Sequence, residues 1–239
     1  MAAARSQGSG TTTDVESGSA PHSRPNAPGP DSPRTRALLT CGIVAGPFYL
    51  GLGIIQGLVR EGFDFGRHPL SVLANGPGGW VQTLNFVLTG AMVLAAALGF
   101  ARVLRPHSRV VGWVLALYGI GMLGAAVFRA DPVDGFPPGT PEGMPATVST
   151  SGILHFAFGG ITFLALAISC IVAARAFSRR GDSVPARRSL LAGVAVLFGF
   201  FSPFFLPMTG SVAGIWFAVI VGWAWLAYAS LHLRRSVSG

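Results

Sequence analysis

The chain has 239 residues, of which 51% are hydrophobic and only 11% are charged. A soluble domain carries about 25% charged residues, so this composition excludes an ordinary soluble globular protein and favours an integral membrane protein. The net charge is +8, and all of the positive charge is carried by Arg, since the chain contains no Lys. Without a basic groove or a nucleic-acid motif, this charge does not indicate a nucleic-acid partner.

Residues 1–36 are rich in Gly, Ser, Thr, Pro and Ala and contain no aromatic residue. Such a segment buries too little apolar surface to offset its ordering entropy, so we expect a disordered cytoplasmic tail. It also lacks the apolar core of a cleavable signal peptide. The first apolar run is therefore expected to serve as the insertion signal.

Six apolar runs follow, each about as long as the 20 residues that a spanning helix needs. They cover Ala37–Val59, Val81–Leu104, Val110–Phe128, Gly152–Phe177, Leu190–Met208 and Val212–Leu233. None alternates with the two-residue period of barrel strands, so residues 37–235 predict an all-α, polytopic membrane bundle of six transmembrane helices.

Small residues and prolines indicate local features of these helices. Gly42 and Gly46, and likewise Gly53 and Gly57, share a helix face and suit close packing. The three prolines inside the runs are expected to kink their helices; they are Pro47, Pro203 and Pro207.

The Arg residues give an orientation. All but three of the 17 fall in the tail, the second and fourth connections and the C-terminus. By the positive-inside rule both termini should be cytoplasmic, with the Arg clusters contacting anionic lipid head groups. Arg without Lys, beside abundant Ala, Gly and Pro, is typical of a GC-rich bacterial genome, so the expected location is the bacterial plasma membrane.

Most of the other polar residues lie in two long outer connections. In the first, Pro69 suits the first position of a helix and Asn75-Gly76 would end it, which predicts a short helix over Leu70–Ala74. The second is rich in Pro and Gly, as lids and binding loops often are.

Five residues of these segments are candidates for a site on the outer face: His68, Ser71, Asp131, Asp134 and His155. Two imidazoles with carboxylates are ligand types that Zn²⁺ takes, and a metal-bound water beside a carboxylate attacks esters or amides. In a purely structural interpretation, His68 caps a short helix, His155 bonds across helices, and the aspartates are solvated or pair with Arg67 and Arg129.

Three segments carry a resemblance: GPFYLGLGIIQGLVREGFDFGRHPLSVLANGPGGWVQTLNF, FRADPVDGFPPGTPEG and GILHFAFGG. Together they resemble the bacterial membrane-protein family known as domain of unknown function 998. The likeness covers roughly residues 40–235. It implies a bundle of about six helices in the plasma membrane and supplies no activity or catalytic residues.

Three functions stay open. The first is a non-catalytic membrane protein that needs no cofactor and binds a lipid or a partner through its outer loops. The second is a metal-assisted hydrolase in which His68, His155 and Asp131 hold a divalent ion such as zinc, Asp134 acts as base and Ser71 is an orienting group. The third is a small transporter, for which few polar groups lie within the spans. No oligomeric state is predicted.

Overall fold

The structure, a computed structural model, describes residues 33–206 and 208–237. Within them the chain forms six long helices and two short 3₁₀ helices, and no strand beyond one isolated bridge. In chain order the elements are α1 (Pro33–Val59), η1 (Leu70–Ala74), α2 (Trp80–Leu104), α3 (Val111–Val127), α4 (Thr150–Arg180), α5 (Ser183–Phe201), η2 (Ser202–Phe204) and α6 (Met208–Ser236).

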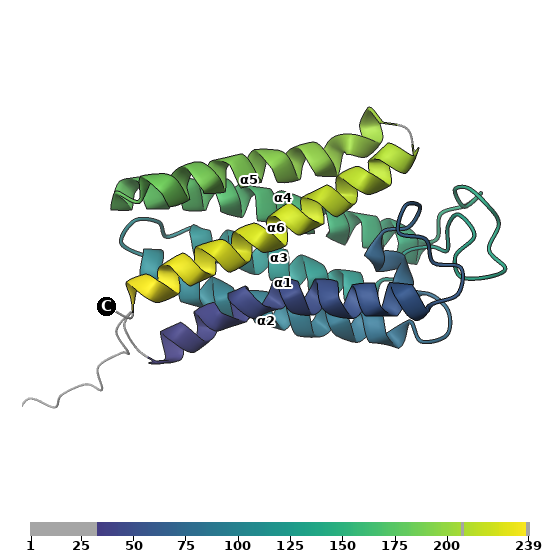
Figure 1. The fold of residues 1–239 in the computed structure, drawn as a ribbon, viewed down its shortest axis with the longest axis horizontal. Helices are drawn as coiled ribbons and strands as arrows, with labels where there is room; N and C mark the ends of the chain where they lie inside the picture. Colours follow the sequence, from purple (N-terminus) through teal and green to yellow (C-terminus); the bar gives the residue numbers. More distant parts are fainter. Residues whose placement is uncertain (1–32, 207, 238–239) are drawn as a thin grey trace, which may run out of the picture.

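The six helices form a closed ring (Figure 1). Each packs against its neighbours in sequence, and α6 returns to pack against α1. Successive helices run in opposite directions, so α1 begins and α6 ends at the same end of the bundle. The two long connections, residues 60–79 and 128–149, lie together at the opposite end and are called the cap below.

Five of the six helices are long and apolar enough to cross a membrane by length and composition. The exception is α3, an apolar helix of 17 residues, which spans about 26 Å against a hydrocarbon core of about 30 Å. The all-α fold predicted from the apolar runs is confirmed.

Several helix ends differ from the predicted spans, because a helix continues beyond its apolar run wherever the backbone allows it. Pro33 starts α1 within the predicted tail, in keeping with the preference of Pro for a first turn. The remainder of that tail, residues 1–32, lies outside the described residues. At the end of α4, Gly181 adopts φ 89°, and α5 begins two residues later at Ser183. The connection between these two helices is therefore shorter than predicted.

The proline predictions have different outcomes. Helix α1 continues through Pro47. The prediction that the fifth helix extends to Met208 is wrong. Helix α5 ends at Phe201, and Pro203 lies in the 3₁₀ turn η2 that follows. Pro203 therefore ends its helix rather than kinking it, which fits a residue that donates no backbone hydrogen bond. Pro207 lies outside the described residues.

Small residues on α1 permit the close approach that the spacing predicted. A Cβ atom on Gly46 would lie 2.7 Å from Cβ of Trp223 on α6, and one on Gly53 would lie 2.8 Å from Cδ1 of Leu70 in the cap. The same face therefore packs on α6 in one half and on η1 in the other. In the centre, the Trp223 ring lies 5.4 Å from the rings of both Tyr49 and Tyr118.

Candidate functional site

The two halves of the cap are joined by a cluster of charged side chains. Arg67 of the first connection donates two hydrogen bonds to Asp134 of the second, from Nε to Oδ2 at 2.9 Å and from Nη2 to Oδ1 at 2.8 Å. Its Nη2 also contacts Glu142. These contacts hold the pKa of the Asp134 carboxyl well below its usual range, chiefly through the Arg67 hydrogen bonds and secondly through the Gly143 amide.

Asp134 occupies the tight turn of a small hairpin. Asp134 and Gly135 both have positive φ, 53° and 86°, as a two-residue hairpin turn requires. Val133 and Phe136 pair across that turn, and the Gly143 amide donates to Asp134 Oδ1 at 3.0 Å. The sequence Asp134-Gly135 therefore fixes the loop that presents the carboxylate to Arg67.

Arg60 donates hydrogen bonds to backbone carbonyls at the end of η1. Its Nη1 donates to the carbonyl of Leu73 at 3.1 Å and its Nη2 to that of Asn75 at 2.6 Å. The guanidinium also lies over the Phe136 ring, 5.1 Å from its centroid. Burial lowers the pKa of Arg60 from its ordinary value. Arg60, which directly follows α1, thus contacts both connections of the cap.

His68 is buried inside the cap, and both of its ring nitrogens have partners. Nδ1 accepts from the Asp64 amide, and Nε2 lies 3.0 Å from the carbonyl oxygen of Asp134. Because a carbonyl only accepts, Nε2 carries the proton. His68 therefore links the two connections and does not cap η1, whose N-terminal cap residue is Pro69.

Asp131 and His155 each bond to backbone atoms near the start of α4. The Asp131 Oδ2 atom accepts from the Ser149 amide at 3.0 Å, beside the helix N-terminus, where a carboxylate is stabilised. One turn into α4, Nδ1 of His155 lies 2.8 Å from the carbonyl oxygen of Phe128, at the end of α3. His155 therefore bonds across helices, as in the structural interpretation.

A cavity of about 350 Å³ lies beneath the cap and between the cap ends of α4, α5 and α6; we call it the cap cavity. Four of the five sequence candidates line it, and these are Ser71, Asp131, Asp134 and His155. The remaining wall is mostly apolar, with Phe163, Phe200 and Ile215 among its residues. His68 is not part of that wall.

A second, smaller cavity of about 110 Å³ lies deeper in the bundle, where Tyr49, Tyr118 and Trp223 line it. We call it the deep cavity. Ser71 and His155 line both cavities, so these two polar residues lie where the cavities adjoin. The cap therefore covers two adjoining cavities, of which the deep cavity extends toward the centre of the bundle.

The metal-site hypothesis requires three ligands close together. Across residues 33–206 and 208–237 the structure has no group of three or more His, Cys, Asp or Glu side chains placed to hold an ion. His68 would have to release a backbone partner to bind metal, and Asp134 would have to release Arg67. The metal ligands remain a prediction from residue type.

The sequence interpretation missed several residues that shape the site. Arg67 appeared only as an alternative partner of the aspartates, a pairing that the structure confirms for Asp134; its role in joining the two halves of the cap and in lining the cap cavity was missed. Gly159 and Gly160 line the same cavity, and a Cβ on either would meet at most one atom, Phe200 Cζ at 4.0 Å from Gly160. The Asp134-Gly135 pair was the available signal for the hairpin; consecutive glycines inside an apolar run were a weaker signal for open space.

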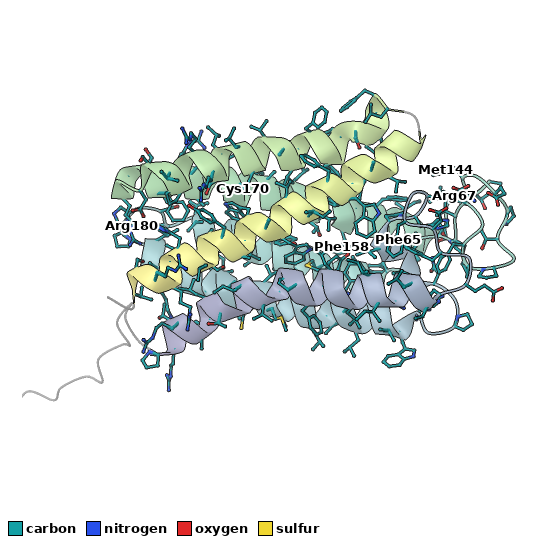
Figure 2. The ribbon with its side chains drawn as sticks, viewed as in Figure 1. Phe65, Arg67, Met144, Phe158, Cys170 and Arg180 are labelled. Atoms are coloured by element: carbon teal, nitrogen blue, oxygen red, sulfur yellow. The ribbon has the colours of Figure 1, made fainter. Side chains whose placement is uncertain are left out.

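Figure 2 shows Arg67 and Met144 at the cap end of the bundle and Arg180 at the other end.

In the comparisons with known proteins, the sequence profile of the family described as protein of unknown function (DUF998) matches residues 43–233. No curated protein and no solved structure matches the chain. A match over most of the length, together with the apolar helical bundle, shows that this is a multi-pass membrane protein of the DUF998 family.

Proposed function

We propose that this protein binds a membrane lipid in the cap cavity and does so without catalysis. The observation that carries the proposal is a cavity of about 350 Å³ with a mostly apolar wall, covered by two interlocked connections. Cavities that hold small molecules have this size and this composition, with a few polar groups among apolar walls.

Access from the membrane supports a lipid rather than a water-soluble ligand. Phe156 on α4 lines the cap cavity and is 60% exposed on the outer face of the helix. Phe200 and Pro203, near the end of α5, line it on the other side. An apolar mouth between two helices is the entry that an acyl chain in the bilayer would use.

The proposal includes six spans in the bacterial plasma membrane, with both termini in the cytoplasm. α2 and α4 run in the same direction, so α3 must return across the membrane between them if both cross it. The positive-inside rule supports the orientation, since Arg is concentrated at the end opposite the cap. At that end we expect Arg187 and Arg188, both exposed, to contact anionic head groups.

Filling the cap cavity tests the lipid proposal. Gly159 and Gly160 line it, and a Cβ atom on either meets at most Phe200 Cζ at 4.0 Å, so Gly159→Leu and Gly160→Leu direct an isobutyl group into the cavity. Gly51→Leu is the matched control, because a Cβ on Gly51 meets nothing within 4 Å and Gly51 lines neither cavity.

The readout is the lipid that remains bound to purified protein, measured by native mass spectrometry. We expect the native protein and Gly51→Leu to retain lipid at equal stoichiometry and both filling variants to lose most of it. Equal retention in all four proteins, with all four folded by circular dichroism, would refute the proposal. A hydrolase acting on the same lipid would instead release its product from the native protein.

A further inference from the structure

The hydrogen bond of His155 fixes which of its nitrogens faces the cavities. The carbonyl oxygen of Phe128 only accepts, so the proton of the neutral ring is on Nδ1. The ring is buried, and among the described residues no carboxylate lies within ion-pair distance of it. A buried imidazole without a counter-ion is neutral. Nε2 is therefore a hydrogen-bond acceptor.

Two polar atoms are thereby available where the cap and deep cavities adjoin. The short side-chain hydrogen bond of His155 uses Nδ1 and goes to Phe128, and its ring also interacts with the backbone of Ala125; the hydroxyl of Ser71 makes no hydrogen bond within the part of the chain that the structure describes. Both residues line both cavities. An imidazole nitrogen on the wall of a mostly apolar cavity favours a ligand that donates a hydrogen bond to it, with Ser71 as a second partner.

The charges around the cap cavity oppose an anionic head group. Among its lining residues Arg67 is the cation, and Asp134 and Glu142 already neutralise it. Asp131 adds a carboxylate that has no Arg partner in the described residues. An anion entering this cavity would face carboxylates without a free cation.

We propose that the cap cavity selects an uncharged, hydroxyl-bearing single-chain amphiphile, such as a long-chain alcohol or a monoacylglycerol, over the anion of a fatty acid. The hydroxyl donates to His155 Nε2 and accepts from Ser71, and the chain lies along the apolar wall formed by Phe163, Phe200 and Ile215. This inference rests on the proposed lipid-binding function and adds the chemistry of the head group.

Three ligands with the same chain separate the contributions: 1-hexadecanol, 1-methoxyhexadecane and hexadecanoate. The methyl ether accepts a hydrogen bond but does not donate one, and hexadecanoate carries a negative charge at pH 8. Each competes with radiolabelled 1-hexadecanol for delipidated protein in one detergent. We expect hexadecanol to bind about three- to tenfold more tightly than the ether, as one neutral hydrogen bond allows, and hexadecanoate to bind most weakly.

His155→Asn is the decisive variant. Its side-chain amide nitrogen takes the place of Nδ1 and retains the donor to Phe128, whereas the acceptor at Nε2 is lost. A merely structural histidine would leave the selectivity unchanged in this variant. We expect the alcohol and the ether to bind His155→Asn equally well, and Ser71→Ala to reduce the difference in part.

The outcomes separate the inference from the function that it assumes. Equal binding of alcohol and ether to the native protein, a preference for hexadecanoate, or unchanged selectivity in folded His155→Asn overturns the head-group assignment while lipid binding stands. Absence of binding for all three ligands, with Gly160→Leu retaining as much lipid as the native protein, overturns both. Loss of all binding in Gly160→Leu with selectivity abolished only in His155→Asn supports both.

Discussion

Trp216 on α6 donates a hydrogen bond from its indole Nε1 to the backbone carbonyl of His68, at 3.3 Å. The same indole lies 5.8 Å from the ring of Phe65. This contact connects the last helix to the first half of the cap, across 148 residues of sequence. Since Trp216 also lines the deep cavity, it connects the cap to the wall of the deep cavity.

Trp216→Phe should loosen the cap without unfolding the bundle. Phenylalanine keeps an aromatic ring beside Phe65 but lacks the N–H donor, so a single hydrogen bond worth about 1 kcal/mol is lost. We expect amide hydrogen exchange over residues 63–69 to accelerate about fivefold, with the α2 and α3 peptides unchanged. An unchanged rate in the cap peptide would show that the indole N–H contributes nothing there.

The Arg67–Asp134 pair should make stability fall in acid. The folded pKa of Asp134 is depressed, so its contribution is fully present above the unfolded value near 3.9 and is lost as pH falls through the folded value. We expect the melting temperature of the detergent-solubilised protein to change little between pH 7 and 5 and to decline below about pH 4.

Asp134→Asn is the matching variant, since it keeps the shape of the side chain and removes its charge. It should melt at a lower temperature than the native protein at pH 7 and depend less on pH below 4. If native protein and variant showed parallel pH profiles, the acid sensitivity would come from other groups.

The sequence predicted the architecture because a helix that spans a bilayer needs a long apolar run, which is visible in the sequence. Apolar runs such as Val81–Leu104 correspond to helices within one residue at each end. The short helix Leu70–Ala74 was also predicted at its observed bounds, from Pro69 before it and Asn75-Gly76 after it. Local chemistry of this kind needs no knowledge of the tertiary structure.

Local chemistry offered Arg67 as a partner of the aspartates, but it did not tell which aspartate it binds or with what geometry. Arg67 and Asp134 are 67 residues apart, and no local pattern tells that they form a bidentate pair. His68 and Ser71 are only three residues apart, yet His68 is enclosed in the cap while Ser71 lines both cavities. His68 precedes η1, which begins at Leu70, so helical spacing does not relate the two side chains and tertiary contacts decide where each one points.

Gly46 should be among the least tolerant positions of α1. A Cβ atom there would lie 2.7 Å from Trp223 Cβ, so Gly46→Leu would force α1 and α6 apart. Overpacking of this kind costs about 1–3 kcal/mol. We expect Gly46→Leu to unfold at lower denaturant concentration than native protein and Gly51→Leu to match the native protein. Similar curves for both variants would mean that α1 and α6 adjust their spacing freely.

The Arg residues at the start of α5 should recruit anionic lipid. Arg187 and Arg188 are exposed, and Arg188 also lies over the ring of Tyr228, 5.0 Å from its centroid. Each Arg near an anionic surface contributes about 1 kcal/mol, so Arg187→Gln should weaken phosphatidylglycerol binding about fivefold. Native mass spectrometry measures how much phosphatidylglycerol and how much phosphatidylcholine the native protein and the variant retain. Equal retention of the two lipids by the native protein would contradict the prediction that these Arg residues recruit anionic lipid.

The orientation is testable by labelling from outside the cell. In a Cys41→Ala, Cys170→Ala background, Thr140→Cys places a thiol in the cap and Ser183→Cys places one at the start of α5, at the opposite end of the bundle. Because Arg is concentrated at the Ser183 end, that end should be retained in the cytoplasm. A membrane-impermeant maleimide should therefore label the Thr140→Cys variant in intact cells and the Ser183→Cys variant only after permeabilisation. The reverse pattern would invert the bundle and place the cap cavity on the cytoplasmic side, where its ligand would come from the inner leaflet.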